Sequence, residues 1–429
     1  MPKILVVGSG GREHALAWQL ARDGGAQLYA APGNPGIASL ARCLPIEATA
    51  ISALASAAEQ LHIDLTVVGP EAPLAAGLVD AFAACGLLAF GPTQRASQLE
   101  ASKVFAKNLM RRARIPTAPF AVFEDPADAA AFVRRLRRPA VVKADGLAAG
   151  KGVVVARDTT EAVSAIDALM VRRVHGDAGA RIVIEEKLDG EEVSVLAFVH
   201  GAHVWPLLPA RDFKRAADGD TGPNTGGMGA VAPPPLPGGV MDQITAQILE
   251  PAAAAMAADG CSFIGVLYAG IMLTPTGPQV LEFNCRFGDP ETQVILPLLD
   301  APLADVLLDV VHGREPELRW ANQSAVCVVL ASGGYPGQFR TGLPISGLDA
   351  GSEDVVVFHA GTGLRGADVV TAGGRVLNIV ARGASIPQAS DRAYTAIPGI
   401  QFDAMQYRRD IGRSAAVAPV APAIAGGGI

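Results

Sequence analysis

The sequence predicts a multidomain protein of the α/β and α+β classes, with an N-terminal parallel-sheet, Rossmann-like domain and a mostly β region at the C-terminal end. Its 429 residues correspond to about three domains at ~150 residues each. Of these residues, 50% are hydrophobic and 18% are charged, so the chain can form large cores and lies outside the disordered class. Near the N-terminus, short β-branched runs alternate with amphipathic helical patterns, which is typical of a parallel sheet.

The N-terminal region is expected to cover residues 1–102 as an α/β domain. Short apolar runs that end at turn residues predict strands at 3–7, 27–31, 65–68 and 87–90. Apolar residues at helical spacing predict helices at 12–22, 74–85 and 94–112. The last of these helices ends before Pro116, because proline disrupts a helix.

The middle of the chain predicts two further regions, at residues 103–190 and 191–322. The first of them has a strand at 119–123, a helix at 126–136, and strands at 140–144 and 153–155 around a glycine-rich segment. Strands at 181–186, 192–200, 264–273 and 279–283 then predict a larger antiparallel sheet. Residues 211–237 form a long irregular loop in this interpretation, and we expect it to be functional because such loops are uncommon inside compact domains.

The last region, residues 323–415, is expected to be mostly β, with apolar runs at 325–331, 355–358 and 375–381. Residues 416–429 follow it. They are rich in alanine, proline and glycine and carry no charge, so we expect a disordered tail.

Charge and cysteine content exclude several classes of protein. The net charge of −7 has the wrong sign for a chain that coats nucleic acid or anionic membranes. No apolar run is long enough for a signal peptide or a membrane-spanning helix, so we expect a cytoplasmic protein with no nucleic-acid or membrane partner. The five cysteines are scattered and never in CxxC spacing, which argues against a zinc site and a disulfide framework. They are Cys43, Cys85, Cys261, Cys285 and Cys327.

A glycine-rich turn follows the first predicted strand and opens the first predicted helix, where backbone N–H groups favour a phosphate. The dinucleotide fingerprint is incomplete, because Glu13 replaces its third glycine and no acidic residue follows the second strand. A smaller phosphate ester therefore fits better. Asn34 and Glu71 follow strands at the carboxyl edge of the same sheet, where ligands bind in open α/β folds. Ordinary turn chemistry is the alternative for both.

Two lysines flank the glycine-rich segment of the second region, Lys143 on a strand and Lys151 after Gly150. A strand lysine beside a glycine flap suits charge neutralisation over a triphosphate. The segment is no Walker A motif, because Gly152 follows Lys151. The acidic run at 185–192 leaves a strand and can offer backbone to an adenine edge and carboxylates to a ribose. Taken alone, it would be a solvated charge run.

Three polar residues alternate at the end of the strand predicted at 279–283. Strand alternation places Glu282, Asn284 and Arg286 on one face. Carboxylate and amide oxygens suit Mg²⁺, and a guanidinium suits a carboxylate or phosphoryl oxygen. The alternative is that these three residues decorate an exposed strand.

Five runs of sequence carry a resemblance to a known family. They are Gly-Gly-Arg-Glu-His (10–14), Gly-Pro-Glu-Ala-Pro-Leu (69–74), Lys-Ala-Asp-Gly-Leu-Ala-Ala-Gly-Lys-Gly (143–152), Asp-Thr-Gly-Pro-Asn-Thr-Gly-Gly-Met-Gly (220–229) and Glu-Phe-Asn-Cys-Arg-Phe-Gly-Asp-Pro-Glu (282–291). Together they resemble the ATP-grasp superfamily and, within it, the phosphoribosylamine–glycine ligase (glycinamide ribonucleotide synthetase) family. The resemblance covers residues 3 to about 415 and includes Arg409-Asp410-Ile411-Gly412.

This resemblance implies ATP-grasp small and large lobes at 103–190 and 191–322, after an N-terminal domain that binds phosphoribosylamine. It implies a purine-biosynthesis ligase that joins glycine to 5-phosphoribosylamine, converts ATP to ADP and phosphate, and passes through glycyl phosphate. The ATP-binding residues would be Lys103, Lys143, Gly150, Lys151, Glu185, Glu186, Lys187, Leu188 and Glu192. The substrate-binding residues would be Gly10, Gly11, Arg12, Glu13, Asn34, Glu71, Asp212, Asn224 and Asp289. The catalytic residues would be Arg286, Lys143 and Lys214, and the ligands of Mg²⁺ or Mn²⁺ would be Glu282 and Asn284.

The chain departs from the expected family pattern at two places. Phe213 stands where that pattern has a histidine before Lys214, so no imidazole acts there. The segment 268–272 carries no acidic metal ligand. Two alternatives stay open: another ATP-grasp carboxylate–amine ligase with a different acid or amine, or a nucleotide-binding protein that has lost catalysis. In each case we expect small-molecule partners and a monomer or weak homodimer.

Overall fold

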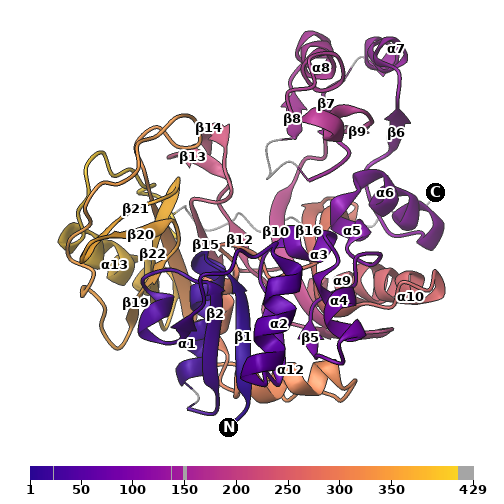
Figure 1. Ribbon diagram of the computed structural model, residues 1–429. Coiled ribbons are helices and arrows are strands. Elements are labelled where there is room, and N and C mark those ends of the chain that lie inside the picture. Colours follow the sequence, from indigo (N-terminus) through magenta and orange to yellow (C-terminus); the bar gives the residue numbers. More distant parts are fainter. Residues whose placement is uncertain (23, 137, 148–151, 414–429) are drawn as a thin grey trace.

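The N-terminal region is built on a five-stranded parallel sheet with the strand order β3-β2-β1-β4-β5. The computed structural model describes residues 1–22, 24–136, 138–147 and 152–413, and this sheet occupies the lower half of Figure 1. The strand order reverses between β1 and β4, so the loops after these two strands lie side by side at the carboxyl edge. The strands are β1 (Lys3–Gly8), β2 (Gln27–Pro32), β3 (Arg42–Cys43), β4 (Leu65–Val68) and β5 (Ala89–Phe90).

Both faces of this sheet are covered, because successive strand side chains point to opposite sides. Ile4 and Val6 pack in one core with the first helix, whereas Leu5 and Val7 pack in another core with the second and fourth helices. The helices are α1 (Gly11–Arg22), α2 (Ile51–Leu61), α3 (Glu71–Ala75) and α4 (Leu78–Ala84), with a short 3₁₀ turn at η1 (Ile37–Ser39).

The single helix expected at 94–112 is wrong, because the chain divides it into α5 (Gln98–Ala101) and α6 (Lys103–Ala113). Ser102 between them is extended, with φ −129° and ψ 111°. Its hydroxyl accepts the Phe105 N–H at 3.1 Å, which is the N-cap role that serine favours. The break lets Glu100 and Lys103 line one pocket.

A small lobe stands apart at the upper right of Figure 1. Its four strands pair antiparallel in the order β6-β9-β7-β8, and two helices pack on one face of them. The strands are β6 (Phe120–Phe123), β7 (Ala140–Ala144), β8 (Val153–Ala156) and β9 (Ile182–Glu186). The helical segments are α7 (Pro126–Leu136), α8 (Thr159–Ile166), η2 (Asp167–Val171) and η3 (Gly176–Gly179).

The larger antiparallel sheet predicted for the third region is present, with the order β11-β10-β16-β17. A register shift beside Gly270 pairs Glu282 with Gly270 and Val280 with Ile271. The strands are β10 (Glu191–His200), β11 (His203–Pro206), β16 (Ile264–Thr274) and β17 (Gly277–Asn284). The helical segments are α9 (Val240–Ile244), η4 (Thr245–Leu249), α10 (Glu250–Ala258), α11 (Thr292–Ile295), η5 (Leu296–Leu298) and α12 (Leu303–Val311).

The irregular loop expected at 211–237 is wrong for much of its length, because it contains four short strands. Two of them complete the C-terminal sheet, whose order is β12-β15-β18-β22-β19, and the other two form the β13–β14 hairpin. The strands are β12 (Arg211–Asp212), β13 (Arg215–Ala217), β14 (Thr221–Asn224), β15 (Gly229–Ala232), β18 (Ser324–Ala331), β19 (Val355–His359) and β22 (Arg375–Gly383). The C-terminal region also has a β20 (Thr362–Arg365) and β21 (Asp368–Thr371) hairpin, α13 (Ile386–Ala396) and η6 (Ile397–Gly399).

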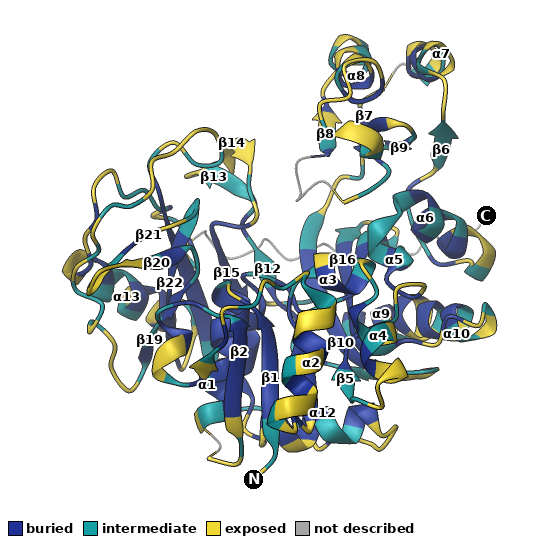
Figure 2. Ribbon diagram, in the orientation of Figure 1, coloured by how far each residue is buried: buried dark blue, intermediate teal, exposed yellow. Residues whose placement is uncertain are grey.

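Burial follows these layers. Figure 2 shows the central strands of the larger sheets as buried and the outer helix faces as exposed. Within the described ranges, no helix combines the length and apolar character needed to cross a membrane. The tail expected at 416–429 lies outside the described residues.

Candidate active site

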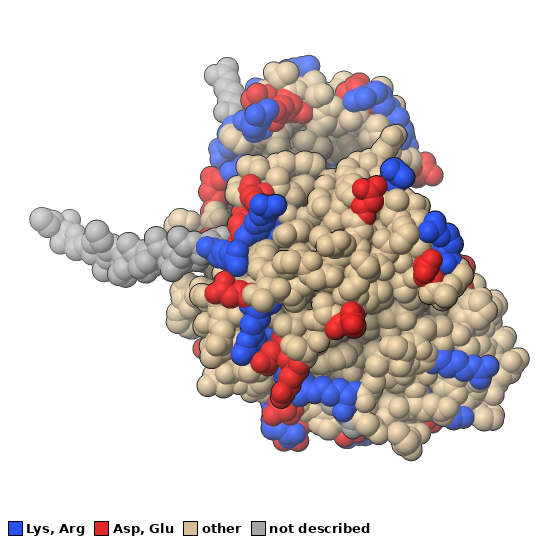
Figure 3. All heavy atoms as spheres, turned by 90° about the vertical axis from the view of Figure 1, so that its left-hand side faces the viewer, with Lys and Arg blue, Asp and Glu red and all other residues tan. Residues whose placement is uncertain are grey.

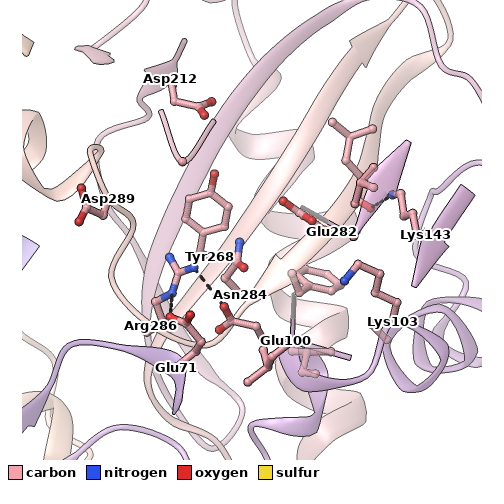
Figure 4. A pocket seen from close by; sticks show the side chains of 18 of the residues that line it. Glu71, Glu100, Lys103, Lys143, Asp212, Tyr268, Glu282, Asn284, Arg286 and Asp289 are labelled. Carbon is pink, nitrogen blue, oxygen red and sulfur yellow. Dashed lines mark hydrogen bonds and ion pairs between the residues drawn. The ribbon is translucent and has the colours of Figure 1, made fainter. Parts of the chain in front are cut away.

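A pocket of about 390 Å³ lies where the four regions meet. The N-terminal region contributes Arg12 and Glu71, and the C-terminal region contributes Arg375. The α5–α6 segment, the small lobe, residues 212–226, β16 and the end of β17 supply further walls, and Figure 4 draws 18 of the side chains and labels ten of them. Residues separated by several hundred positions in the chain therefore share one cavity.

Arg286 lies between two carboxylates from different elements (Figure 4). Its Nη2 lies 3.1 Å from Glu100 Oε1 and its Nε lies 3.5 Å from Glu71 Oε2. Glu100 also accepts the Cys285 N–H at 2.7 Å. Burial alone would lower the pKa of Arg286. The charges of Glu100 and Glu71 outweigh this effect, so the pKa lies above its usual value. The guanidinium is therefore permanently charged and held in a fixed orientation.

The two carboxylates of this cluster differ in electrostatic state. Burial raises the pKa of Glu100, and Arg286 offsets this only in part. Burial acts in the same direction on Glu71, but Arg286 and Arg12 together hold the pKa of Glu71 below its usual value. Glu71 therefore keeps its charge at neutral pH.

Glu282 and Asn284 end β17 and both face the pocket (Figure 4). Burial would raise the pKa of Glu282, but Lys214, Lys143 and Lys103 lower it, so the carboxylate is ionised. A carboxylate and an amide oxygen on one strand face fit a magnesium ion that takes its other ligands from phosphates and water. In the described part of the chain, no three or more acidic, histidine or cysteine side chains are grouped so that they could hold a metal ion by themselves.

Lys143 reaches the pocket from β7, where its side chain is almost completely buried. Its Nζ donates to the Leu281 carbonyl at 2.9 Å and forms an ion pair with Glu185. Glu185 also pairs with Lys107, another buried lysine of the pocket wall. Burial lowers the pKa of Lys107 to about 8, against the opposing effect of Glu185. The single carboxylate of Glu185 therefore pairs with both Lys107 and Lys143. This leaves positive charge that is available to an anionic ligand.

Lys103 opens α6 on the same side of the pocket, and its Nζ lies 3.4 Å from the Gly146 carbonyl. Burial lowers the pKa of Lys103, and Glu282 opposes this effect. Gly146 and Gly152 border the pocket at the two sides of the glycine-rich segment. The predicted ATP-binding residues Gly150 and Lys151 lie outside the described residues.

The acidic run expected to bind adenine and ribose has other contacts. The Glu185 side chain is taken by the two lysines, Glu186 pairs with Arg138, and Lys187 pairs with Asp189. Glu192 pairs with Lys214. Neither Leu188 nor these acidic residues are among the residues that line the pocket.

Asp212 and Lys214 line the pocket, whereas Phe213 between them lies in the C-terminal core, 5% exposed. Burial would lower the pKa of Lys214, but Asp212 and Glu192 raise it well above its usual value. Burial raises the pKa of Asp212, and the charge of Lys214 opposes this effect. The unexpected phenylalanine therefore occupies a packing position and not the pocket wall.

Glu13 organises the N-terminal loop from within. Its Oε2 accepts the Gly10 N–H at 2.6 Å, its Oε1 pairs with Arg12, and the residue is 2% exposed. A Cβ at Gly69 would lie 2.0 Å from Glu13 Oε1, so the adjacent loop requires glycine there. Of the predicted residues in this loop, Arg12 lines the pocket, and Gly10, Gly11 and Glu13 do not.

Two other predicted substrate residues are not brought to the pocket. Asn34 donates to the Ser9 carbonyl at 2.8 Å and to the His359 carbonyl at 3.0 Å, and it accepts the Ile37 N–H at 2.9 Å. Its side chain is thus used internally. Asn224 is exposed at the end of β14, and its neighbours Thr225 and Gly226 line the pocket instead.

Asp289 does line the pocket, where it is held by Arg375 and Gln293. Burial would raise the pKa of Asp289, but Arg375 and Arg12 lower it. Arg375 Nη1 donates to the Asp289 carbonyl at 2.9 Å and to the Gly226 carbonyl at 2.6 Å. The C-terminal region therefore fixes two loops of the pocket through one guanidinium.

Sequence reasoning missed five ionisable residues of the pocket wall. For Tyr268 the signal was its place in the predicted strand at 264–273, which comes directly before the strand that leads to Asn284. In the structure Tyr268 pairs in register with Asn284 and hydrogen-bonds Glu291 at 3.0 Å. A signal also existed for Glu291, which lies in the same run as Glu282. Isolated positions such as Glu100 carried none. The five are Glu100, Lys107, Tyr268, Glu291 and Arg375.

Comparisons with known proteins agree over nearly the whole chain. Residues 2–100, 101–292 and 325–414 match the N, ATP-grasp (A) and C domains of phosphoribosylglycinamide synthetase. A phosphoribosylamine–glycine ligase of Halalkalibacterium halodurans is 48% identical over 414 residues, covering 96% of this chain and 97% of the relative. One from Synechocystis is 49% identical, covering 96% of this chain and all of the relative.

Solved structures give the same result. The crystal structure of a Thermotoga maritima phosphoribosylamine–glycine ligase has a TM-score of 0.85 and 33% identity, covering 95% of this chain and 99% of that one. The biotin carboxylase domain of a Hydrogenobacter thermophilus 2-oxoglutarate carboxylase, solved with MgADP, has a TM-score of 0.72 at 15% identity, covering 94% and 91%. That second likeness concerns the fold alone. The predicted family and fold class are confirmed, and the chain belongs to the phosphoribosylamine–glycine ligase family of ATP-grasp ligases.

Proposed function

We propose that the protein ligates glycine to 5-phosphoribosylamine, forming glycinamide ribonucleotide, ADP and phosphate in purine biosynthesis. The observation that carries this proposal is the shared pocket. Phosphate-attracting lysines, the Glu282–Asn284 pair and the fixed Arg286 lie in one cavity with Arg12 and Glu71 of the N-terminal region. ATP and 5-phosphoribosylamine would thus bind to different walls of the same site.

The chemistry requires activation of the glycine carboxylate, because an amine does not displace an unactivated carboxylate oxygen. Lys143 and Lys103 would hold the transferring phosphates, since preorganised charges act strongly in a water-poor cleft. Arg286 would hold the glycine carboxylate and the phosphoryl oxygens of glycyl phosphate. Arg12, at the start of α1, would hold the phosphate of 5-phosphoribosylamine so that its amine faces the acyl carbon.

Glu282 and Asn284 would hold Mg²⁺ or Mn²⁺, which suits their hard oxygen donors. When bound, the metal supplies charge neutralisation between the phosphates. Lys214 beside Glu282 and Asp212 would complete the charge balance of the same wall.

We also propose small molecules as the sole partners, and a cytoplasmic monomer or weak homodimer. Lysine and arginine side chains are interspersed with aspartate and glutamate on the face in Figure 3, and neither sign gathers there. Such a surface offers no broad basic track for nucleic acid.

The direct test is ADP release from ATP with glycine, ribose 5-phosphate and ammonia, the last two generating phosphoribosylamine in situ. ADP release should require all components. Release that proceeds equally well with another amino acid, or without ribose 5-phosphate, would point to a different acid or amine. No release with any of them would contradict the ligase assignment.

A further inference from the structure

The β13–β14 hairpin lies at the top of the body of the molecule in Figure 1, next to the C-terminal region. Its residues are mostly exposed, so little apolar burial holds it in place. Its two ends nevertheless continue into pocket residues, Lys214 on one side and Thr225 on the other. The Thr225 N–H and hydroxyl donate to the Lys214 carbonyl at 2.7 and 2.9 Å. The position of the hairpin therefore determines the position of this wall.

One buried guanidinium ties the hairpin to the end of the chain. Arg408 is 1% exposed, and its Nη1 donates to Asp220 Oδ1 at 2.6 Å and to the Arg215 carbonyl at 3.3 Å. Its Nε and Nη2 form a two-pronged contact with Asp410, at 2.8 and 2.7 Å. Asp410 in turn accepts the Gly219 N–H at 2.9 Å. Charge-assisted, two-pronged contacts of this kind are both strong and directional.

Asp220, at the turn, has a φ of 53°, a left-handed conformation that aspartate and asparagine adopt more readily than most other side chains. The Arg408 guanidinium also lies 5.0 Å from the centre of the Phe213 ring, within cation–π range. Phe213 separates the pocket residues Asp212 and Lys214. Arg408 thus contacts the hairpin at its turn and its base, and it also contacts Phe213 between β12 and the hairpin.

We propose that Arg408 is a positioning residue for the reaction, which clamps the β13–β14 hairpin and thereby fixes Lys214 and Thr225 at the pocket wall. This inference rests on the proposed ligase function, because it assigns the clamp a kinetic consequence. Arg408 touches no pocket atom itself, since its contacts run to the hairpin, Asp410 and Phe213.

The test compares Arg408→Met and Asp220→Asn with a matched control, Arg409→Met, which makes the same change at an exposed neighbouring side chain. Asparagine tolerates the left-handed backbone, so Asp220→Asn keeps the test valid if Arg408→Met does not fold. One readout is the rate of tryptic cleavage after residues 214 and 215, followed by mass spectrometry. The other is the kcat for ADP release together with the KM for ATP.

Arg408→Met and Asp220→Asn both lose the charge-assisted contact between Arg408 and Asp220. Each variant should therefore be cleaved about tenfold faster and have a kcat about tenfold lower than wild type. The KM for ATP should stay within about twofold, because Lys103 and Lys143 lie on other elements. Arg408→Lys should restore little, since an ammonium cannot make the two-pronged contact. Arg409→Met should behave as wild type.

Wild-type cleavage rates in Arg408→Met and Asp220→Asn would overturn the clamp, and faster cleavage with unchanged kcat would overturn its kinetic role. If the wild-type protein itself releases no ADP with glycine and phosphoribosylamine, the proposed function fails. The cleavage rates then still decide whether Arg408 holds the hairpin.

Discussion

The two ends of the pocket handle charge in opposite ways. At the small-lobe end, Lys107 and Lys143 share the buried carboxylate of Glu185, and Lys103 has Glu282 as its main acidic neighbour. At the other end, Arg286 lies between Glu71 and Glu100, and Arg375 is paired with Asp289. The first arrangement leaves positive charge for a polyanion, whereas the second fixes each guanidinium in orientation. We infer that the small-lobe end binds its ligand through positive charge, whereas the other end depends on the fixed orientation of its guanidinium groups.

The largest effect should come from removing charge at the small-lobe end. Lys143→Met should lower kcat about 100- to 1,000-fold, because a preorganised cation that faces transferring phosphates contributes that much to catalysis. Lys3→Met removes the same charge from a lysine of β1 that lies outside the pocket and donates to the Leu61 carbonyl, and it should change little. Steady-state kinetics of both variants provide the measurement. A wild-type kcat for Lys143→Met would contradict the inference that the small-lobe end acts through its positive charge.

Arg286→Lys keeps the charge at the other end and removes the planar fork. If geometry matters there, kcat should fall about 10- to 100-fold although the net charge is unchanged. The thermal midpoint should be measured in parallel, to separate catalysis from folding. Activity close to wild type would mean that charge alone suffices at this end too.

Two buried, uncharged histidines connect the N- and C-terminal regions. His14 Nδ1 accepts the His359 N–H at 2.8 Å. Burial, and then His359, lower the pKa of His14 to about 3, and burial lowers the pKa of His359 to about 4. The unfolded chain binds protons at these sites near pH ~6.5, so it gains protons first as pH falls. Stability should therefore decline from about pH 6.5 down to about pH 4.

His359→Asn removes one of the two titrating groups and should flatten the decline of the melting temperature between these pH values. His203→Asn, at an exposed histidine, serves as the control and should keep the wild-type slope. Equal slopes in all three proteins would show that the buried histidine pair does not control acid stability.

The smallest effect should come from Phe213→His. Its ring lies in the C-terminal core beside Arg408 and not in the pocket, so kcat at pH 8 should stay within a few-fold of wild type. Below pH ~6.5 an imidazolium beside Arg408 would be repelled, and this variant should lose stability faster than wild type. A tenfold gain in kcat would assign the position a catalytic role.

Local sequence patterns predicted the parts of the site that one element carries alone. Strand alternation placed Glu282, Asn284 and Arg286 on one face, and all three line the pocket. The position after β4 likewise indicated Glu71. Asn34 also follows a strand at this edge, but its side chain is used by Ser9, Ile37 and His359. A pattern can locate a residue without fixing what its side chain contacts.

The remainder depended on contacts between distant segments. β12 and β15 belong to a sheet whose other strands begin after residue 323, and Val231 lies opposite Val326. The sequence around β12 and β15 is polar and rich in glycine, so no local pattern predicted these strands. Glu100 and Arg375 carry no motif and reach the pocket only through tertiary packing. The break at Ser102 was hidden because the helical spacing continues across it.

Glycine should be phosphorylated before the amine of phosphoribosylamine attacks, and transfer of an oxygen isotope from glycine to phosphate reveals this order. The enzyme would be given glycine with ¹⁸O in its carboxylate, ATP and phosphoribosylamine generated in situ, and the released phosphate would be analysed by mass spectrometry. One labelled oxygen should appear in inorganic phosphate, with ADP as the sole nucleotide product. Unlabelled phosphate, or AMP with pyrophosphate, would contradict the acyl phosphate route and the roles given to Arg286, Glu282 and Asn284.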